Sequence, residues 1–326
     1  MLVQVHSLSR SFGHGPTRVD AVKQVSFQFD RGEIFGFIGP NGAGKSTTMR
    51  ILASLDLPTS GDCTVAGLST IDDADRVRRL IGYMPDSYGA YPNMTVWEYL
   101  DFFSRAYDMP IDRRTRAVGD VIDFCQLGGL REKLVTTLSK GMKQRLCLGR
   151  CLIHDPQLLI LDEPSAGLDP RARIEFRELL RLLAGQGKAI FISSHILAEL
   201  EELCDAVAII EQGALVAAGK VREIKAAVAH KAQVQAAAEP DTATETIEIR
   251  LAAPVERLAA TLAEQPELGE IQIDHLLITA RCPALAATQA ALLKRLIEAG
   301  LPVCRFAARE RNLEDLFMHL TEGKVA

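Results

Sequence analysis

The feature that most constrains this chain is a glycine-rich loop that directly follows an apolar, strand-like run at residues 34–38. The loop consists of Gly39, Pro40, Asn41, Gly42, Ala43, Gly44, Lys45, Ser46 and Thr47. Its glycines let backbone N–H groups converge on phosphates because no Cβ stands in the way, and a helix starting here turns its positive end toward the anion. In such a loop, Lys45 reaches the β- and γ-phosphates and the Ser46 hydroxyl binds Mg²⁺. We therefore expect a strand, a loop and a helix that together bind a nucleotide.

The composition is that of a globular chain with room for two domains. Its 326 residues are 48% hydrophobic and 24% charged, which is enough to bury a sizeable core. The formal net charge of −5 argues against a general nucleic-acid binder, which would need a basic face. No apolar run reaches the roughly 18 to 20 residues that span a bilayer, so we expect the chain itself to stay in the cytoplasm.

The first part of the chain, residues 1–225, alternates strand-like and helix-like stretches. This order predicts an α/β domain with a largely parallel sheet flanked by helices. Residues 158–162 and 189–193 are continuous apolar runs, as expected of strands covered on both faces. A helix is expected at 171–184, because Pro170 suits a first helical turn.

The second part is predicted to be a small accessory domain at residues 246–326, after a linker at 226–245. The linker begins rich in Ala and Gln and then breaks at 239–242, which reads Glu-Pro-Asp-Thr. The order that follows is strand, helix, strand, strand, helix, strand, with a last helix from Asn312. That order predicts a ferredoxin-like α/β sandwich.

Acidic and histidine side chains follow the two apolar runs. Asp162 and Glu163 end one run, and His195 ends the other. Because the carboxyl ends of strands in an open α/β sheet bind ligands, we expect Asp162 to hold Mg²⁺ and Glu163 to polarise the water that attacks the γ-phosphate. A strand that ends beside these acids would place His195 as a hydrogen-bond donor to the γ-phosphate.

A second anion-binding helix terminus is predicted at residues 138–145, with Ser139 at the cap and Gly141 two residues on. One active site does not need two such termini on a single chain. The simplest resolution is that the second terminus serves the nucleotide of another protomer, in a head-to-tail dimer loaded with ATP.

The first 225 residues resemble the nucleotide-binding subunit of an ABC transporter. The resemblance rests on the loop at 39–47, the acids at 162 and 163, the family's signature sequence at 138–145, its D-loop at 165–169 and its switch histidine at 195. It implies an ABC-type ATPase domain with a helical subdomain at about 86–155. It also implies that Phe12 stacks on adenine, and that Ser139, Gly141 and Asp169 act at the partner's nucleotide.

Two positions depart from the usual pattern of the family. Asp86 stands where Gln is common; it still offers an oxygen to Mg²⁺ or the water, but it adds negative charge and loses the amide donor. Lys140 stands in the signature where Gly is frequent, while Ser139 and Gly141 are retained.

The carboxyl-terminal part resembles the accessory domain of exporter subunits that work with separate membrane proteins, including drug-resistance, antibiotic-export and sodium-efflux systems. The specific piece is 312–321, whose apolar positions also suit an ordinary docking helix. Regulation and dimer support both stay open as roles for this domain.

The resemblance implies an ATP-hydrolysing subunit that uses ATP and Mg²⁺, pairs with a second ATPase protomer as a homodimer or heterodimer, and drives a membrane permease. It would lie at the cytoplasmic face of the inner membrane, held there by the permease. The surface between Asp86 and Trp97, with Tyr88 and Tyr91, is the expected receiver of the permease's coupling segment, because aromatic side chains are enriched at contact surfaces.

Two other functions are alternatives to this one. A soluble ABC-type ATPase that remodels a ribosome, DNA or a protein is disfavoured, because this chain has one ATPase half and no sustained heptads. A regulatory nucleotide-binding module without turnover is disfavoured by the presence of both Glu163 and His195.

Overall fold

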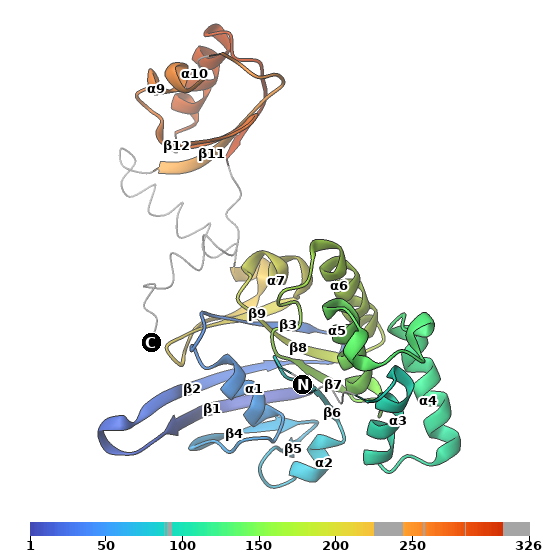
Figure 1. Cartoon of the computed structure of the whole chain (residues 1–326). Coiled ribbons are helices and arrows are strands. Elements are labelled where there is room, and N and C mark those ends of the chain that lie inside the picture. The colour runs from blue at the N-terminus through green and yellow to red at the C-terminus, as the bar shows by residue number, and fades with distance from the viewer. Residues whose placement is uncertain (88, 90–92, 225–243, 257, 284, 309–326) are drawn as a thin grey trace. The chain divides into compact units, whose positions relative to one another are not determined.

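The computed structural model describes residues 1–87, 89, 93–224, 244–256, 258–283 and 285–308, and it divides into two compact units. The first unit contains Met1–Ile224, and the second takes in the described residues from 244 onward (Figure 1). Nearly all of the expected linker and the expected helix from Asn312 lie outside the described residues.

The first unit is built around a ten-stranded sheet with the order β5-β4-β1-β2-β10-β9-β3-β8-β7-β6. The strands are β1 (Val3–Phe12), β2 (Val19–Phe29), β3 (Ile34–Ile38), β4 (Ser60–Val65), β5 (Leu68–Ser69), β6 (Ile81–Met84), β7 (Leu158–Leu161), β8 (Ala189–Ser194), β9 (Ala206–Glu211) and β10 (Ala214–Lys220). Strands β9, β3, β8, β7 and β6 are parallel neighbours. The pairs among β1, β2, β4 and β5 are antiparallel, as is the pair of β9 with β10. Strand β10 also pairs in parallel with β2, through Ala214 and Lys23. Five of the nine neighbouring pairs in this sheet are thus parallel and four are antiparallel, so the sheet is mixed rather than largely parallel.

The burial of each strand explains this division. Every residue of β3, β7 and β8 is buried, as expected for parallel strands covered on both faces. In β2, by contrast, the buried Val25, Phe27 and Phe29 alternate with the exposed Ser26 and Gln28. A strand with one polar face belongs in an antiparallel sheet that is solvated on that face.

Seven α-helices lie wholly within the described residues of the first unit, and residues 221–224 are also helical. The seven are α1 (Lys45–Leu52), α2 (Ala74–Arg78), α3 (Val96–Ala106), α4 (Ile111–Phe124), α5 (Lys140–Leu152), α6 (Pro170–Gly185) and α7 (Leu197–Leu203). Figure 1 shows α3 and α4 grouped beside α5, whereas α6 and α7 lie over β9, β3 and β8. Met49 and Leu52 of α1 pack in one core with Phe27 of β2 and Phe191 of β8, so α1 joins the antiparallel and parallel parts of the sheet.

Strand β6 ends the sheet, and side chains from α5 and the residues just after it bond to its outer carbonyls. Arg150 Nη2 donates to the Tyr83 oxygen at 3.0 Å. His154 Nε2 donates to the Ile81 oxygen at 3.0 Å. These contacts fix the helical subdomain to the strand that leads to Asp86.

Gly82 in β6 is expected to be intolerant of any side chain. A Cβ there would lie 2.4 Å from the Cys151 oxygen, whereas nothing lies within 4 Å of a Cβ at Gly119 in α4. We expect Gly82→Ala to lower the free energy of unfolding by about 1–3 kcal/mol. The matched control Gly119→Ala should raise it by about 0.5–1 kcal/mol, since Ala is the better helix former. Urea denaturation followed by tryptophan fluorescence measures both, because the single tryptophan, Trp97, lies in the first unit. Equal effects of the two substitutions would contradict the packing described here.

The second unit has its own four-stranded antiparallel sheet and core. Its elements are β11 (Thr244–Leu251), α9 (Leu258–Ala263), β12 (Gly269–Asp274), β13 (Leu277–Pro283), α10 (Ala286–Glu298) and β14 (Val303–Ala308). The strand order is β12-β13-β11-β14, so β13 lies between the two strands that α9 connects. Ile247, Ile249 and Ile278 pack on Leu292 and Leu296 of α10. Across both units, no helix in the described ranges is long and apolar enough to cross a membrane.

Candidate active site

The glycine-rich loop between β3 and α1 has a backbone that only glycine fits at two positions. Gly44 caps α1 with φ of 100°, and a Cβ there would lie 2.3 Å from the Ala21 oxygen. A Cβ at Gly39 would lie 2.3 Å from the Ile210 oxygen. The loop is thus pressed against β2 and β9, and the first N–H groups of α1 are directed at the space in front of it.

Lys45 is the first residue of α1, and its ammonium is held inside the loop. Nζ donates to the Gly39 oxygen at 2.8 Å and to the Pro40 oxygen at 3.1 Å. It also lies 3.7 Å from Glu163 Oε1, and only 6% of the Lys45 side chain is exposed. Burial lowers the pKa of Lys45, although the carboxylates of Glu163 and Asp162 oppose that shift.

The two acids after β7 are joined through Ser193 at the end of β8. The Ser193 hydroxyl donates to Asp162 Oδ1 at 2.7 Å and accepts the Glu163 N–H at 2.8 Å. Asp162 is buried, and Glu163 has a φ of 49°. A non-glycine residue in this left-handed region is uncommon, and here it turns the Glu163 carboxylate toward Lys45.

His195 completes a chain of contacts across three strand ends. Its Nδ1 lies 2.8 Å from Glu163 Oε2. Since an ionised carboxylate only accepts hydrogen bonds, Nδ1 carries the proton in this contact. Lys45, Glu163 and His195 follow β3, β7 and β8, which are neighbours in the order β3-β8-β7. The expected convergence of these side chains at one edge of the sheet is therefore observed.

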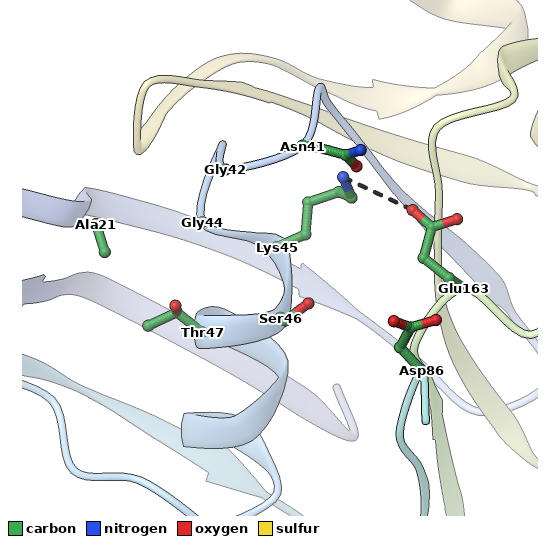
Figure 2. Close-up of a pocket in the computed structure, with 9 residues that line it drawn as sticks. All are labelled: Ala21, Asn41, Gly42, Gly44, Lys45, Ser46, Thr47, Asp86 and Glu163. Atoms are coloured by element: carbon green, nitrogen blue, oxygen red, sulfur yellow. Dashed lines mark ion pairs between the residues drawn. The ribbon is translucent and has the colours of Figure 1, made fainter. Parts of the chain in front are cut away.

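A pocket opens between the loop and the end of β6. It is lined by Ala21, Asn41, Gly42, Gly44, Lys45, Ser46, Thr47, Asp86 and Glu163. Figure 2 shows the Ser46 hydroxyl and the Asp86 carboxylate facing the same space as Glu163, while the Lys45 ammonium points toward the Glu163 carboxylate. Glu163 Oε1 is buried there without a hydrogen-bond partner. The pocket thus combines oxygen donors, one ammonium and a helix terminus, which suits a metal-bound polyphosphate.

The predicted trans residues lie away from this pocket and close to one another. Ser139 caps α5, where its hydroxyl accepts the Met142 N–H at 3.3 Å, and Asp169 caps α6 by accepting the Ala172 N–H at 2.9 Å. Gly141 faces Ala172, since a Cβ at Gly141 would lie 3.5 Å from that side chain. The amino termini of α5 and α6 therefore form a second polar surface, which the structure does not bring into the pocket.

Lys140, the unusual residue of the signature segment, reaches across this second surface. Its Nζ would lie 2.2 Å from a Cβ built at Gly167, where φ is 68°. The ammonium thus packs on the backbone of the segment that precedes α6.

The predicted adenine-stacking residue and Trp97 of the expected docking surface for the permease lie elsewhere in the first unit. Phe12 ends β1, is 41% exposed and is not among the residues that line the pocket. On the expected docking surface, Tyr88 and Tyr91 lie outside the described residues. Trp97 is half-buried, with the guanidinium carbon of Arg131 3.6 Å above its ring.

Sequence reasoning missed the role of Ser193 and of Ala21. Ser193 precedes a histidine in an apolar run, but its bonds to Asp162 and Glu163 depend on the pairing of β7 with β8. Ala21 carries no chemical signal in the sequence, yet it lines the pocket and its backbone oxygen closely approaches Gly44.

Comparisons with known proteins find related ATP-binding proteins. The sequence profile described as ABC transporter matches residues 22–166. The chain is 33% identical over 321 residues to Nod factor export ATP-binding protein I of Ralstonia nicotianae, which covers 98% of this chain and 94% of that protein. It is 34% identical over 218 residues to linearmycin resistance ATP-binding protein LnrL of Bacillus subtilis, covering 67% of this chain and 69% of that one. A solved structure described as the ATP binding subunit of an ABC transporter matches with a TM-score of 0.63 and 31% identity, covering 70% of this chain and 94% of that one.

Proposed function

Because this chain belongs to the ATP-binding proteins of ABC transporters, we propose that it hydrolyses ATP to power export through a separate membrane permease. The relative that covers 98% of the chain is named for Nod factor export, which supports export over import. The soluble remodelling ATPase has no counterpart among the relatives described above. The observation that carries the proposal is the contact chain from Lys45 through Glu163 to His195 at three neighbouring strand ends.

The loop from Gly39 to Thr47 holds the ATP phosphates. Its backbone N–H groups and the amino terminus of α1 supply donors and positive potential. Lys45 Nζ, now bonded to the Gly39 and Pro40 oxygens, turns to the β- and γ-phosphates when the nucleotide enters. Phe12 stacks on adenine at the end of β1.

Ser46, Asp162 and Asp86 are the residues that would hold Mg²⁺. Hydroxyl and carboxylate oxygens are the ligands this ion prefers, and Ser46 and Asp86 face the same space (Figure 2). When bound, the ion neutralises charge that develops on the phosphate oxygens.

Glu163 acts as the general base. It accepts a proton from a water molecule while the water oxygen bonds to the γ-phosphorus and the bond from that phosphorus to the ADP oxygen breaks. His195, bonded to Glu163 Oε2, orients the carboxylate. Half of its side-chain surface is exposed, which leaves the ring accessible to a γ-phosphate oxygen.

Ser139, Gly141 and Asp169 serve the nucleotide of a second protomer, in a homodimer or a heterodimer. Their separation from the pocket supports this arrangement, because a head-to-tail pair places the second polar surface of each chain over the loop of the other. Closure on two ATP molecules then pulls the coupling segments of the permease, and hydrolysis reopens the pair.

The chain acts at the cytoplasmic face of the inner membrane, where the permease holds it. The surface near Trp97, at the start of α3, receives the coupling segment of the permease. The stacking of Arg131 on Trp97 supports this assignment, since it keeps a rigid aromatic group half-exposed at the surface.

Affinity capture from native membranes tests the proposal. Tagged Glu163→Gln protein is purified from detergent-solubilised membranes with MgATP present, and mass spectrometry identifies what accompanies it. A multi-span membrane protein in near-equal amount, missing from membranes without the tagged chain, is the expected result. Ribosomal or DNA-repair proteins without a membrane partner would favour the soluble remodelling ATPase instead.

A further inference from the structure

We infer that Arg10 is a positioning residue for the base of the nucleotide, acting through Phe12. Arg10 covers one face of the Phe12 ring and leaves the other face for a purine. This inference rests on the proposed function, because it concerns how ATP is recognised.

The contact between the two side chains follows from the strand geometry. Residues two apart in a strand point to the same side, so Arg10 and Phe12 of β1 are neighbours on one face. The Arg10 guanidinium carbon lies 4.5 Å from the centroid of the Phe12 ring, which is the geometry of a cation–π contact. A planar guanidinium stacks on an aromatic face as a lysine ammonium does not.

The Arg10 guanidinium also forms an ion pair, with the carboxylate of Asp56. Arg10 Nη2 donates to Asp56 Oδ1 at 2.8 Å, and the two side chains are 24% and 20% exposed. Arg10 Nε is buried without a hydrogen-bond partner. Burying a donor without a partner costs free energy, so the ion pair with Asp56 alone does not account for the place of Arg10 beside an exposed aromatic ring.

The end of the β1–β2 hairpin fixes Phe12 close to the phosphate loop. The Ser11 N–H donates to Thr59 Oγ1 at 2.9 Å, and Phe12 pairs with Val19. Two residues after Val19, Ala21 lines the pocket and its oxygen approaches Gly44. Phe12 therefore lies beside the segment that borders the phosphate site, at 41% exposure, with one ring face already covered.

The physical consequence is preorganisation of the stacking surface. Without the guanidinium, the Phe12 side chain gains rotamers and must be ordered when ATP binds, which weakens binding of the base but not of the phosphates. We expect Arg10→Met to raise the Kd for ATP about 5-fold, and the KM for ATP equally, with kcat unchanged. The Kd for inorganic tripolyphosphate, which has no base, should change less than about 2-fold.

The experiment uses the full chain with its membrane partner for kinetics and the full chain for binding. Competition against a fluorescent ATP analogue gives the Kd values for ATP and tripolyphosphate. The matched control is Arg114→Met, because Arg114 forms an ion pair with Asp101 at 2.6 Å and both side chains are similarly buried, at 15% and 17% exposure. That control should leave both Kd values unchanged.

A double-mutant cycle shows whether Arg10 acts through Phe12. In a Phe12→Leu background, Arg10→Met should change the Kd for ATP by less than about 2-fold, because the ring it supports is gone. Additive effects, or an equal change for ATP and tripolyphosphate, would overturn the inference. A wild-type chain that binds tripolyphosphate but not ATP would instead overturn the proposed function.

Discussion

Glu163→Gln is expected to lower kcat for ATP hydrolysis by at least about 100-fold while leaving the affinity for ATP within about 3-fold of wild type. An amide has the shape of the carboxylate and can still contact His195, 2.8 Å away, but it cannot accept the proton of the attacking water. The Lys45 ammonium, 3.7 Å from Glu163 Oε1, stays available to the phosphates. The Glu163→Gln variant should therefore bind ATP nearly as well as wild type but hydrolyse it far more slowly.

Three measurements check that ATP binding is retained while hydrolysis is lost. Phosphate release gives kcat, a fluorescent nucleotide gives affinity, and light scattering with MgATP gives mass. We expect the variant to form a stable dimer with MgATP, because closure is no longer undone by hydrolysis. Glu178→Gln is the control, since Glu178 pairs with Arg181 on the surface of α6, away from the pocket, and this variant should hydrolyse ATP normally. Substantial hydrolysis by Glu163→Gln, or a variant that stays monomeric with MgATP, would count against the mechanism.

Lys45→Met is expected to weaken ATP binding by about 10- to 100-fold, the range that one or two charge-assisted hydrogen bonds to phosphate would supply. Its effect on stability should be small. The substitution loses hydrogen bonds to the Gly39 and Pro40 oxygens, but it also removes a buried charge whose pKa burial has lowered. We expect the free energy of unfolding to stay within about 1 kcal/mol of wild type, or roughly 3 °C in Tm.

The sign of the charge effect follows from linkage. A lysine with a lowered pKa in the folded state binds protons less well there than in the unfolded chain, so its charge destabilises the fold at neutral pH. That penalty declines only as pH rises through the lowered pKa toward the ordinary value of 10.5. At pH 7 the Lys45→Met variant therefore lacks the whole destabilising contribution of the buried charge to the free energy of unfolding.

Lys188→Met is the matched control for this prediction. Lys188 Nζ also donates to a backbone oxygen, that of Pro156 at 2.8 Å, and pairs with Asp155 at 2.6 Å. It follows α6, outside the pocket, so its loss should leave the affinity for ATP unchanged. Similar loss of affinity in both variants would mean that the Lys45 effect is a general effect of losing a lysine.

The parts of the fold that the sequence predicted best are those that depend on local pattern. Continuous apolar runs located β3, β7 and β8, and Pro170 marked the start of α6. The antiparallel strands of the first unit were missed because the alternation of buried and exposed residues is interrupted over part of their length. Strand β1, for example, shifts register against β2 three times between Val5 and Ser11.

The sequence pointed to several residues of the candidate site but not to the contacts between them. The residue types and spacing predicted Lys45 from the glycine-rich loop that follows one apolar run, and Glu163 and His195 from the ends of two others. The bond from Ser193 to Asp162 was not predictable, since it depends on which strands pair and in what register. The stacking of Arg10 on Phe12 was missed for a different reason: an arginine two residues before an aromatic has many structural uses, and only the position of Asp56 selects this one.

The side chains that bond to the outer carbonyls of β6 also bear on the solubility of the chain. A strand at the end of a sheet offers unpaired backbone groups that a second molecule can extend into an aggregate. Arg150 and His154 occupy the Tyr83 and Ile81 oxygens of this edge, so those acceptors are not available to a foreign strand. Burial lowers the pKa of His154 to about 4, so the ring stays neutral at pH values above that and its contact with the Ile81 oxygen does not depend on protonation there. Arg150 and His154, at the end of α5 and just after it, thus shield the β6 edge of the sheet from self-association.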